Sequence, residues 1–257
     1  MRWPAEAIWE QVAPGLPGFT VEILPQIDST NTELMRRARA GQTDPVLLVA
    51  ERQTAGRGRL GRSWHSDTSG GRGTLAFSLG LALDPVDWSG LSLAVGLSLA
   101  NSLHPQLQLK WPNDIWLAGR KLAGILIETT QVGTQRYAVV GVGINIEAVP
   151  ADGLRTPPAA LVELLPAATP ASVLGQVAAP LVRDVLAFAQ QTFAPLRAAF
   201  AQRDLLLGRE VECSDGSTGT ACGVDVDGAL LVHTARGPLT IRSAEVSVRP
   251  ATPTDSL

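Results

Sequence analysis

The sequence has few of the residues that build covalent frameworks or metal sites, with two cysteines and three histidines among 257 residues. Cys213 and Cys222 are too few for a disulfide framework, and we expect two reduced thiols, which a hairpin could bring together. The histidines lie far apart, and no histidine or cysteine has metal-ligand spacing. This pattern argues against a structural zinc site and leaves few candidates for a Ser-His-Asp triad.

The chain also lacks a strong net charge and a long hydrophobic run. Its formal charge is −3, so any binding of nucleic acid would need a local basic patch. The longest apolar run, residues 91–103, is too short to cross a bilayer, and residues 1–6 include no apolar segment of the signal-peptide type. We therefore expect a globular cytoplasmic protein that does not associate with membranes.

Lysine is scarce, because only Lys110 and Lys121 are lysines among the 21 basic residues. A codon bias toward arginine accounts for the scarcity, but not for the proximity of the two that are left. Lysine is a compact point charge and arginine a planar fork, so they are not interchangeable where one small cation must reach one spot. Both lysines are therefore candidate site residues.

Hydrophobic periodicity and turn signals predict an α+β fold. We expect strands over 20–27, 45–51, 74–83, 107–111, 115–117, 121–129 and 136–146, and helices after residue 30, over 85–103 and over 171–203. The strand over 74–83 alternates, which predicts one apolar face, and Thr30 with Glu33 fits a capping box. Residues 150–170 are expected to be mostly irregular.

A change in the sequence pattern near residue 205 indicates a second domain. Short strands with tight turns follow it, which predicts a small β-barrel or hairpin domain. The length of the chain allows one large and one small domain. We expect a domain over residues 1–204 and another over 205–257.

A glycine- and arginine-rich segment lies between Gln53 and Trp64. Its glycines can turn backbone N–H groups inward as an anion nest, its arginines can bind phosphate bidentately, and Trp64 offers a flat surface to an aromatic base. These residues are Gly56, Arg57, Gly58, Arg59, Gly61 and Arg62. The segment is not a Walker A loop, and a solvated loop or a nucleic-acid groove remains the alternative.

The stretch Lys110–Asp114 combines a strand break with two polar side chains. Pro112 interrupts a strand-like run because it removes a ladder donor. The amide of Asn113 could read the edge of a base, and the carboxylate of Asp114 could hold a metal ion. An ordinary Pro-Asn-Asp turn is the alternative.

Two further polar residues stand in apolar strands. Lys121 follows a predicted hairpin turn, where it lies either on the exposed face or beside a developing negative charge. Asn145 would need partners if buried, and Gly141 and Gly143 in the same strand indicate a close approach by a ligand or a backbone.

Taken together and in order, these stretches resemble those of the biotin–protein ligases. The similar segments are Asp28–Asn31, Gln53–Trp64, Lys110–Asp114, Arg120–Leu126 and Gly141–Ile146. Any one of them is a weak signal, but their order over residues 20–146 is highly specific. Residues 241–245 also resemble part of the small SH3-like C-terminal domain of that family.

The resemblance implies a class II synthetase-like mixed β-sheet with flanking helices, followed by an SH3-like β-barrel. It implies activation of biotin by ATP to biotinyl-5′-AMP with Mg²⁺, and transfer of biotin to a lysine of a biotin carboxyl carrier protein. Both steps build negative charge at one place, so they need positioned cations and N–H donors. A homodimer is plausible from the family alone.

The resemblance also assigns roles to single residues. Lys121, Arg57 and Arg59 are implied as catalytic residues, because Lys121 would meet the biotin carboxylate and the phosphate while the arginines cover the adenylate. Biotin would be bound by Ser29, Thr30, Asn31, Gln53, Gly56, Arg57, Lys121 and Gly124. ATP would be bound by Arg57, Arg59, Arg62, Trp64, Asn113, Lys121 and Asn145, and Asp114 would hold Mg²⁺.

The sequence departs from the family pattern at two places. The segment from His65 to Thr74 looks longer and more flexible than the compact turn of the family. About twenty residues precede the first strand, too few for a helix-turn-helix domain, so we predict no repressor function and no binding of DNA.

The sequence leaves other functions open. A lipoate–protein ligase shares the broad fold, and a non-catalytic biotin or nucleotide binder would not need Lys121. A nucleic-acid binder would interleave aromatic residues with cations, but the chain has one tyrosine and five phenylalanines.

Overall fold

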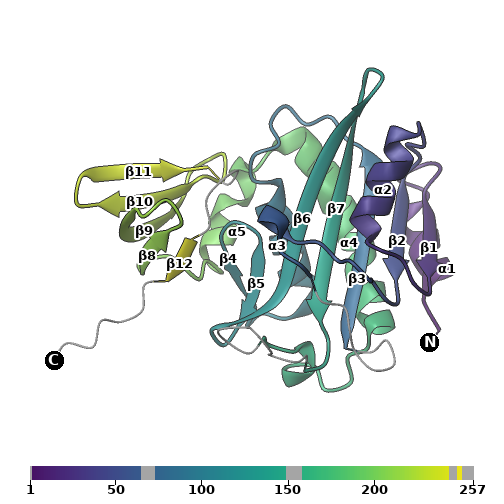
Figure 1. Ribbon diagram of the computed structural model, residues 1–257, viewed down its shortest axis with the longest axis horizontal. Coiled ribbons are helices and arrows are strands. Elements are labelled where there is room, and N and C mark those ends of the chain that lie inside the picture. The colour runs from purple at the N-terminus through teal and green to yellow at the C-terminus, as the bar shows by residue number, and fades with distance from the viewer. Residues whose placement is uncertain (1, 65–72, 149–157, 243–247, 251–257) are drawn as a thin grey trace.

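The computed structural model describes residues 2–64, 73–148, 158–242 and 248–250. The chain forms two β-sheets, and helices cover both faces of the larger sheet (Figure 1). The predicted α+β class is confirmed. The structure of residues 65–72 lies outside the described part, and so do residues 150–157 of the irregular segment predicted over 150–170.

The larger sheet has seven strands in a mixed arrangement. Its spatial order is β1 (Thr20–Leu24), β2 (Val46–Ala50), β3 (Thr74–Ala82), β7 (Gln135–Asn145), β6 (Arg120–Val132), β5 (Asp114–Leu117) and β4 (Gln108–Lys110). Strands β1 and β2 are parallel, and every other neighbouring pair is antiparallel. Strands β5 and β6 are joined by a tight hairpin at Ala118–Gly119, where both residues have positive φ.

Helices lie on both faces of this sheet. The helices are α1 (Ala5–Val12), α2 (Thr30–Arg39), α3 (Leu91–Leu103), α4 (Pro170–Gln191) and α5 (Arg197–Ala201), with 3₁₀ turns at Arg59–Gly61, Leu161–Glu163 and Ala194–Leu196. Helix α2 covers one face, and α3 and α4 pack on the other (Figure 1). Side chains of β2 alternate between the two layers, since Leu48 packs with α2 while Leu47 joins the main core.

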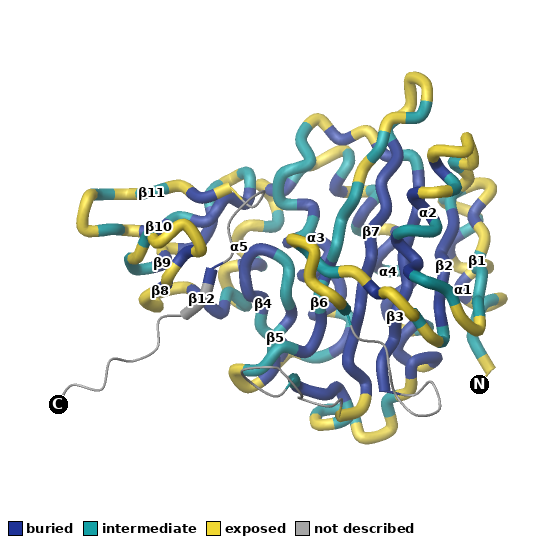
Figure 2. The backbone as a smooth tube through the Cα atoms, in the orientation of Figure 1, coloured by how far each residue is buried: buried dark blue, intermediate teal, exposed yellow. Residues whose placement is uncertain are grey.

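Because helices cover both faces of the sheet, the burial of β3 differs from the predicted pattern. Its alternation predicted one apolar face, but every residue from Thr74 to Leu81 is buried (Figure 2). The polar member Ser78 is fully buried because it lies under helix α2 and bonds to that helix. The strand is therefore interior on both sides, and its polar position belongs to a buried network.

Helix α2 begins one residue earlier than its capping pattern predicted. Ser29 is the N-cap, because its side chain accepts a hydrogen bond from the backbone N–H of Thr32. Glu33 does not close a capping box with Thr30 but pairs with Arg36 and Arg37. Helix α3 begins later than predicted, at Leu91 after the positive-φ residue Gly90, and not at residue 85.

The second sheet has five antiparallel strands. Their order is β11 (Gly237–Ile241), β10 (Leu230–Thr234), β9 (Thr218–Val224), β8 (Glu210–Cys213) and β12 (Val248–Pro250). Cys213 is buried in β8 and Cys222 is exposed in β9, and both are free thiols. The sequence therefore predicted the β-structure and the reduced cysteines of this region correctly.

Helix α4 is long and apolar enough, by length and composition, to cross a bilayer. Ten of its residues are buried, however, and eight of these belong to the main core, on which the helix meets α1, α3 and β3. Packing in the interior accounts for its apolar character, as for the central helix of a globular domain.

Candidate active site

One cavity of about 600 Å³ opens beside β6 and β7 and collects nearly all the predicted site residues. The predicted residues that line it are Ser29, Thr30, Asn31, Gln53, Arg57, Arg59, Arg62, Trp64, Asn113, Asp114, Lys121, Gly124 and Asn145. Gly56 does not line the cavity. A Cβ there would lie 2.4 Å from the carbonyl oxygen of Trp64, so this glycine lets two parts of the loop cross.

Lys121 reaches the cavity because of a bulge in β6. Ile115 pairs with Ala123, but the next residue of β5, Trp116, pairs with Lys121. In a regular strand Lys121 and Gly124 would point to opposite faces, since an odd number of positions separates them. The extra residue shifts the alternation, so that both line the cavity.

The ammonium of Lys121 is held by a carboxylate and an indole. Its Nζ lies 2.7 Å from Oδ1 of Asp114 and 5.9 Å from the ring centroid of Trp64. A Cβ on Gly124 would be 3.2 Å from Nζ, so the strand backbone lies close beneath the charge. The arrangement places one small cation at a defined point of the wall.

Two facing glycines form the seat of Trp64. Gly124 in β6 and Gly143 in β7 are direct cross-strand partners. A Cβ on Gly143 would lie 2.3 Å from Cε2 of Trp64, and one on Gly124 would lie 3.4 Å from Cζ3. The close approach that glycines in this strand predicted is thus made by the indole of the protein itself.

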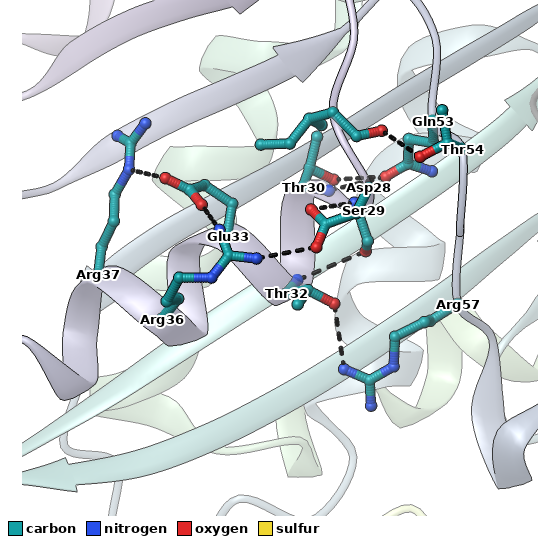
Figure 3. Close-up of polar contacts among 11 residues, drawn as sticks. Asp28, Ser29, Thr30, Thr32, Glu33, Arg36, Arg37, Gln53, Thr54 and Arg57 are labelled. Atoms are coloured by element: carbon teal, nitrogen blue, oxygen red, sulfur yellow. Dashed lines mark hydrogen bonds and ion pairs between the residues drawn. The ribbon is translucent and has the colours of Figure 1, made fainter.

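A polar network closes the end of the cavity that lies next to helix α2. Oε1 of Gln53 accepts hydrogen bonds from the backbone N–H and the hydroxyl of Thr30, at 2.8 and 3.1 Å (Figure 3). The hydroxyl of Ser78 lies 2.7 Å from Oγ1 of Thr30 and 2.6 Å from Oδ1 of Asn31. Gly141 leaves room for Asn31, since a Cβ there would lie 1.9 Å from Oδ1.

The arginine-rich segment is folded back on itself, and we call residues 53–64 the arginine loop. The N–H of Gly58 donates to the carbonyl of Arg62 at 2.7 Å, and the N–H of Trp64 donates to that of Gly56 at 2.9 Å. These bonds hold the loop as a compact hairpin-like turn. Its arginines therefore extend from a defined backbone frame, although most of the loop is exposed to solvent.

Two arginines of this loop bind different sides of the cavity. Arg57 forms an ion pair with Glu128 of β6 at 2.9 Å, and Nη1 of Arg59 donates to Oδ1 of Asn113 at 3.3 Å. Burial lowers the pKa of the Arg59 guanidinium, whereas the nearby carboxylate of Asp114 raises it. Because a guanidinium is not deprotonated in proteins, Arg59 stays charged although it is partly desolvated.

The other end of the cavity, at Lys110 and Val248, lies against the second sheet. Nζ of Lys110 donates to the carbonyl of Val248 at 2.7 Å, and Nε1 of Trp111 donates to that of Gly228 at 3.0 Å. Asn113 is fixed by a bond from its amide to the carbonyl of Ile125, at 2.8 Å. Lys110 is thus a cavity residue whose ammonium also holds the two sheets together.

Asn145 stabilises the bulge through hydrogen bonds to backbone carbonyls. Its Nδ2 donates to the carbonyls of Ala159, at 3.2 Å, and of Lys121, at 3.5 Å. The N–H of Ala159 donates to the same Lys121 carbonyl at 2.9 Å. The amide therefore stabilises the backbone from which Lys121 extends.

Comparisons with known proteins show to which family the chain belongs. A profile of the biotin/lipoate A/B protein ligase family matches residues 23–145. The chain is 35% identical to the biotin–[acetyl-CoA-carboxylase] ligase of Paracoccus denitrificans over 87% of this chain and 98% of that one. It is 34% identical to the bifunctional ligase/repressor BirA of Escherichia coli over 92% of this chain and 78% of that one.

The chain belongs to the biotin–protein ligase family. A solved structure of the Aquifex aeolicus biotin protein ligase, in complex with biotin and ATP, matches with a TM-score of 0.76 at 30% identity and covers 90% of this chain and 99% of that one. The family resemblance predicted from the ordered motifs is therefore confirmed.

Two polar residues of this ligase site were not among the sequence candidates. Ser78 bonds to the Thr30 and Asn31 side chains, and Glu128 bonds to Asn31 and Arg57. Ser78 stands among apolar residues of the buried strand β3, and a polar residue in such a place needs partners, so that signal could have identified it. Glu128 stands where β6 changes from apolar to polar residues and carries no such signal.

The ligase site has a limited capacity for a metal ion. Among the described residues, no group of three or more acidic, histidine or cysteine side chains could hold one, and Asp114 is the one carboxylate among those that line the cavity. Mg²⁺ is commonly held by one or two carboxylates together with substrate phosphates and water. Asp114 fits an ion that arrives with a nucleotide.

Proposed function

We propose that the chain activates biotin with ATP to biotinyl-5′-AMP and transfers the biotinyl group to a lysine of a biotin carboxyl carrier protein. The observation that carries the proposal is the position of Lys121. Its ammonium and the arginine loop point into one cavity of about 600 Å³, a size suited to a small-molecule ligand. The family membership of the chain supports the same reaction.

The two ends of the cavity suit the two parts of the adenylate. Ser29, Thr30 and Gln53 supply hydroxyl and amide groups for the ureido ring of biotin, with Asn31 held behind them. The other end supplies Asn113 for adenine, together with Arg62. The indole of Trp64 separates these ends and gives an apolar wall against which either ligand can pack.

In the first step an oxygen of the biotin carboxylate attacks the α-phosphorus of ATP. A new phosphorus–oxygen bond forms as the bond to pyrophosphate breaks. Lys121 meets both anions at the point where they join, so its charge offsets the repulsion between them and the charge of the transition state. Arg57 and Arg59 add positive charge from the loop above.

In the second step the neutral amine of the carrier lysine attacks the acyl carbon, and AMP leaves as the amide forms. Amine addition at an activated acyl group needs no nucleophile from the protein, in keeping with the absence of a cysteine among the described cavity residues. Mg²⁺, held by the phosphates and Asp114, would supply further neutralisation of the nucleotide charge.

Pyrophosphate exchange tests the proposal against a lipoate–protein ligase and a non-catalytic binder. We expect ATP–pyrophosphate exchange to depend on biotin and to stay at background with lipoate or with neither acid. Exchange supported by lipoate instead would replace the substrate. Binding of biotin without exchange would point to a non-catalytic protein.

Substitution of Arg59 by glycine is expected to loosen the loop over the adenylate. The change removes the bond to Asn113 and one charge above the phosphate, so activated biotin should escape and label bystander proteins. A loss of about 1–2 kcal/mol corresponds to roughly a tenfold rise in labelling. The measurement is biotinylation of added albumin, and unchanged labelling would contradict this role.

The remaining expectations extend this proposal. We propose that residues 1–204 form the catalytic domain and that residues 205–257 form an SH3-like β-barrel, that the protein acts in the cytoplasm, and that it neither binds DNA nor enters membranes. The near-neutral charge supports the absence of DNA binding. A homodimer, implied by the family, can be tested by sedimentation.

A further inference from the structure

Glu128 lies outside the cavity but contacts two residues that line it. It stands on β6, and its side chain is 21% exposed. Oε2 accepts a hydrogen bond from Nδ2 of Asn31 at 3.0 Å, and Oε1 pairs with Nη2 of Arg57 at 2.9 Å. One carboxylate therefore connects strand β6, helix α2 and the arginine loop.

The contact with Arg57 is a forked, charge-assisted one. Nη1 of Arg57 also lies 3.4 Å from Oε2 of Glu128 and 3.4 Å from the hydroxyl of Thr32 (Figure 3). Paired guanidinium–carboxylate bonds fix orientation as well as distance. The base of the loop is consequently held against helix α2 in one geometry.

Asn31 gives the carboxylate a rigid support. Its Oδ1 lies 2.6 Å from the Ser78 hydroxyl, and its Nδ2 also donates to the carbonyl of Leu126 at 3.2 Å. Gly141 leaves no space in which the amide could turn. The Glu128 carboxylate is thereby oriented by buried groups that belong to the sheet.

We propose that Glu128 is a positioning residue that keeps the Arg57 end of the arginine loop fixed, in the absence and in the presence of substrate, and thereby limits escape of the adenylate. The part of this inference that concerns the adenylate rests on the proposed function. The part that concerns the Glu128–Arg57 contact stands on the ligand-free geometry alone. A test can therefore separate the two.

Tryptic cleavage of the ligand-free protein tests the contact without any reaction. Glu128→Gln keeps an oxygen for Asn31 and the same shape, but it removes the charge opposite Arg57. Cleavage at Arg57, Arg59 and Arg62, followed by mass spectrometry, should accelerate about fivefold, the upper range for a half-exposed ion pair. Glu22→Gln is the matched control, because it removes the pair between Glu22 of β1 and Arg37 of helix α2, away from the loop.

Equal cleavage of the Glu128→Gln variant and the wild type would overturn the inference, whatever reaction the protein performs. A lower melting temperature with faster cleavage at every arginine would also overturn it, since that result indicates a general structural role. Faster cleavage confined to the loop, at an unchanged melting temperature, would support it.

Escape of the adenylate provides the second measurement. With Glu128→Gln we expect release of biotinyl-5′-AMP to rise about fivefold, whereas the single-turnover rate of its formation changes less than twofold. Added salt should raise release in the wild type but not in the variant, because salt screens exposed ion pairs. Equal salt responses would contradict the role of the charge, and a wild type that forms no adenylate would refute the proposed function but not the cleavage result.

Discussion

Replacement of Lys121 by arginine is expected to abolish adenylate formation almost completely although the charge is kept. The Lys121 ammonium fits between the Asp114 carboxylate at 2.7 Å and the backbone of Gly124. A guanidinium is larger and planar, so it cannot put its charge at the same point. Loss of one positioned donor to a developing anion costs about 10²–10³-fold in rate, and biotin-dependent ATP–pyrophosphate exchange should fall by that factor.

The control for this prediction makes the same kind of exchange outside the site. Arg136→Lys alters a cation of β7 that pairs with Asp84, just beyond the end of β3, at 2.9 Å. The rate of pyrophosphate exchange in this variant should stay within about twofold of the wild type, because exposed pairs contribute little. Near-normal exchange in Lys121→Arg, measured at saturating biotin and ATP, would remove Lys121 from the proposed mechanism.

The sequence predicted which motifs form the site because these motifs are local. Each segment contributes its own backbone geometry: the loop glycines, the strand break at Pro112 and the hairpin turn before Lys121. The order of the strands could not be read in the same way, since β3 pairs with β7 across a long insertion. Pairings between distant segments depend on the packing of the whole sheet.

The direction of Lys121 illustrates a second limit. Periodicity assigns a side chain to one face of a strand, but a single bulge reverses the assignment for every residue beyond it. Nothing in Arg120–Leu126 specifies that bulge locally. It arises where β6 pairs with β5 and where Asn145 and Ala159 bind the Lys121 carbonyl.

A third limit concerns residues whose importance lies in their partners. Ser78 and Glu128 are ordinary members of strand sequences, and their roles follow from groups that other elements bring to them. Conversely, the contact of Asn145 with the nucleotide stays a prediction, whereas the structure shows that its amide supports the backbone of the bulge. Roles of this kind become visible only once the tertiary contacts are known.

Substitution of Gly143 by alanine is expected to displace Trp64 and with it the wall of the cavity. The added Cβ would lie 2.3 Å from Cε2 and 2.7 Å from Nε1 of the indole, well inside contact distance. The strand cannot retreat, because Gly143 pairs with Ala76 on one side and Gly124 on the other. The indole must therefore move, which costs about 1–3 kcal/mol as overpacking.

That cost corresponds to a roughly 10- to 100-fold loss in kcat/KM for biotin-dependent pyrophosphate exchange if the indole is needed where it stands. Tryptophan fluorescence should change in the free protein as well. Gly15→Ala is the matched control, since its Cβ would meet nothing nearer than 3.8 Å, and its activity should equal that of the wild type. If Gly143→Ala retained full kcat/KM with altered fluorescence, the position of Trp64 would not matter for the ligand, and the facing glycines would serve only the packing of the sheet.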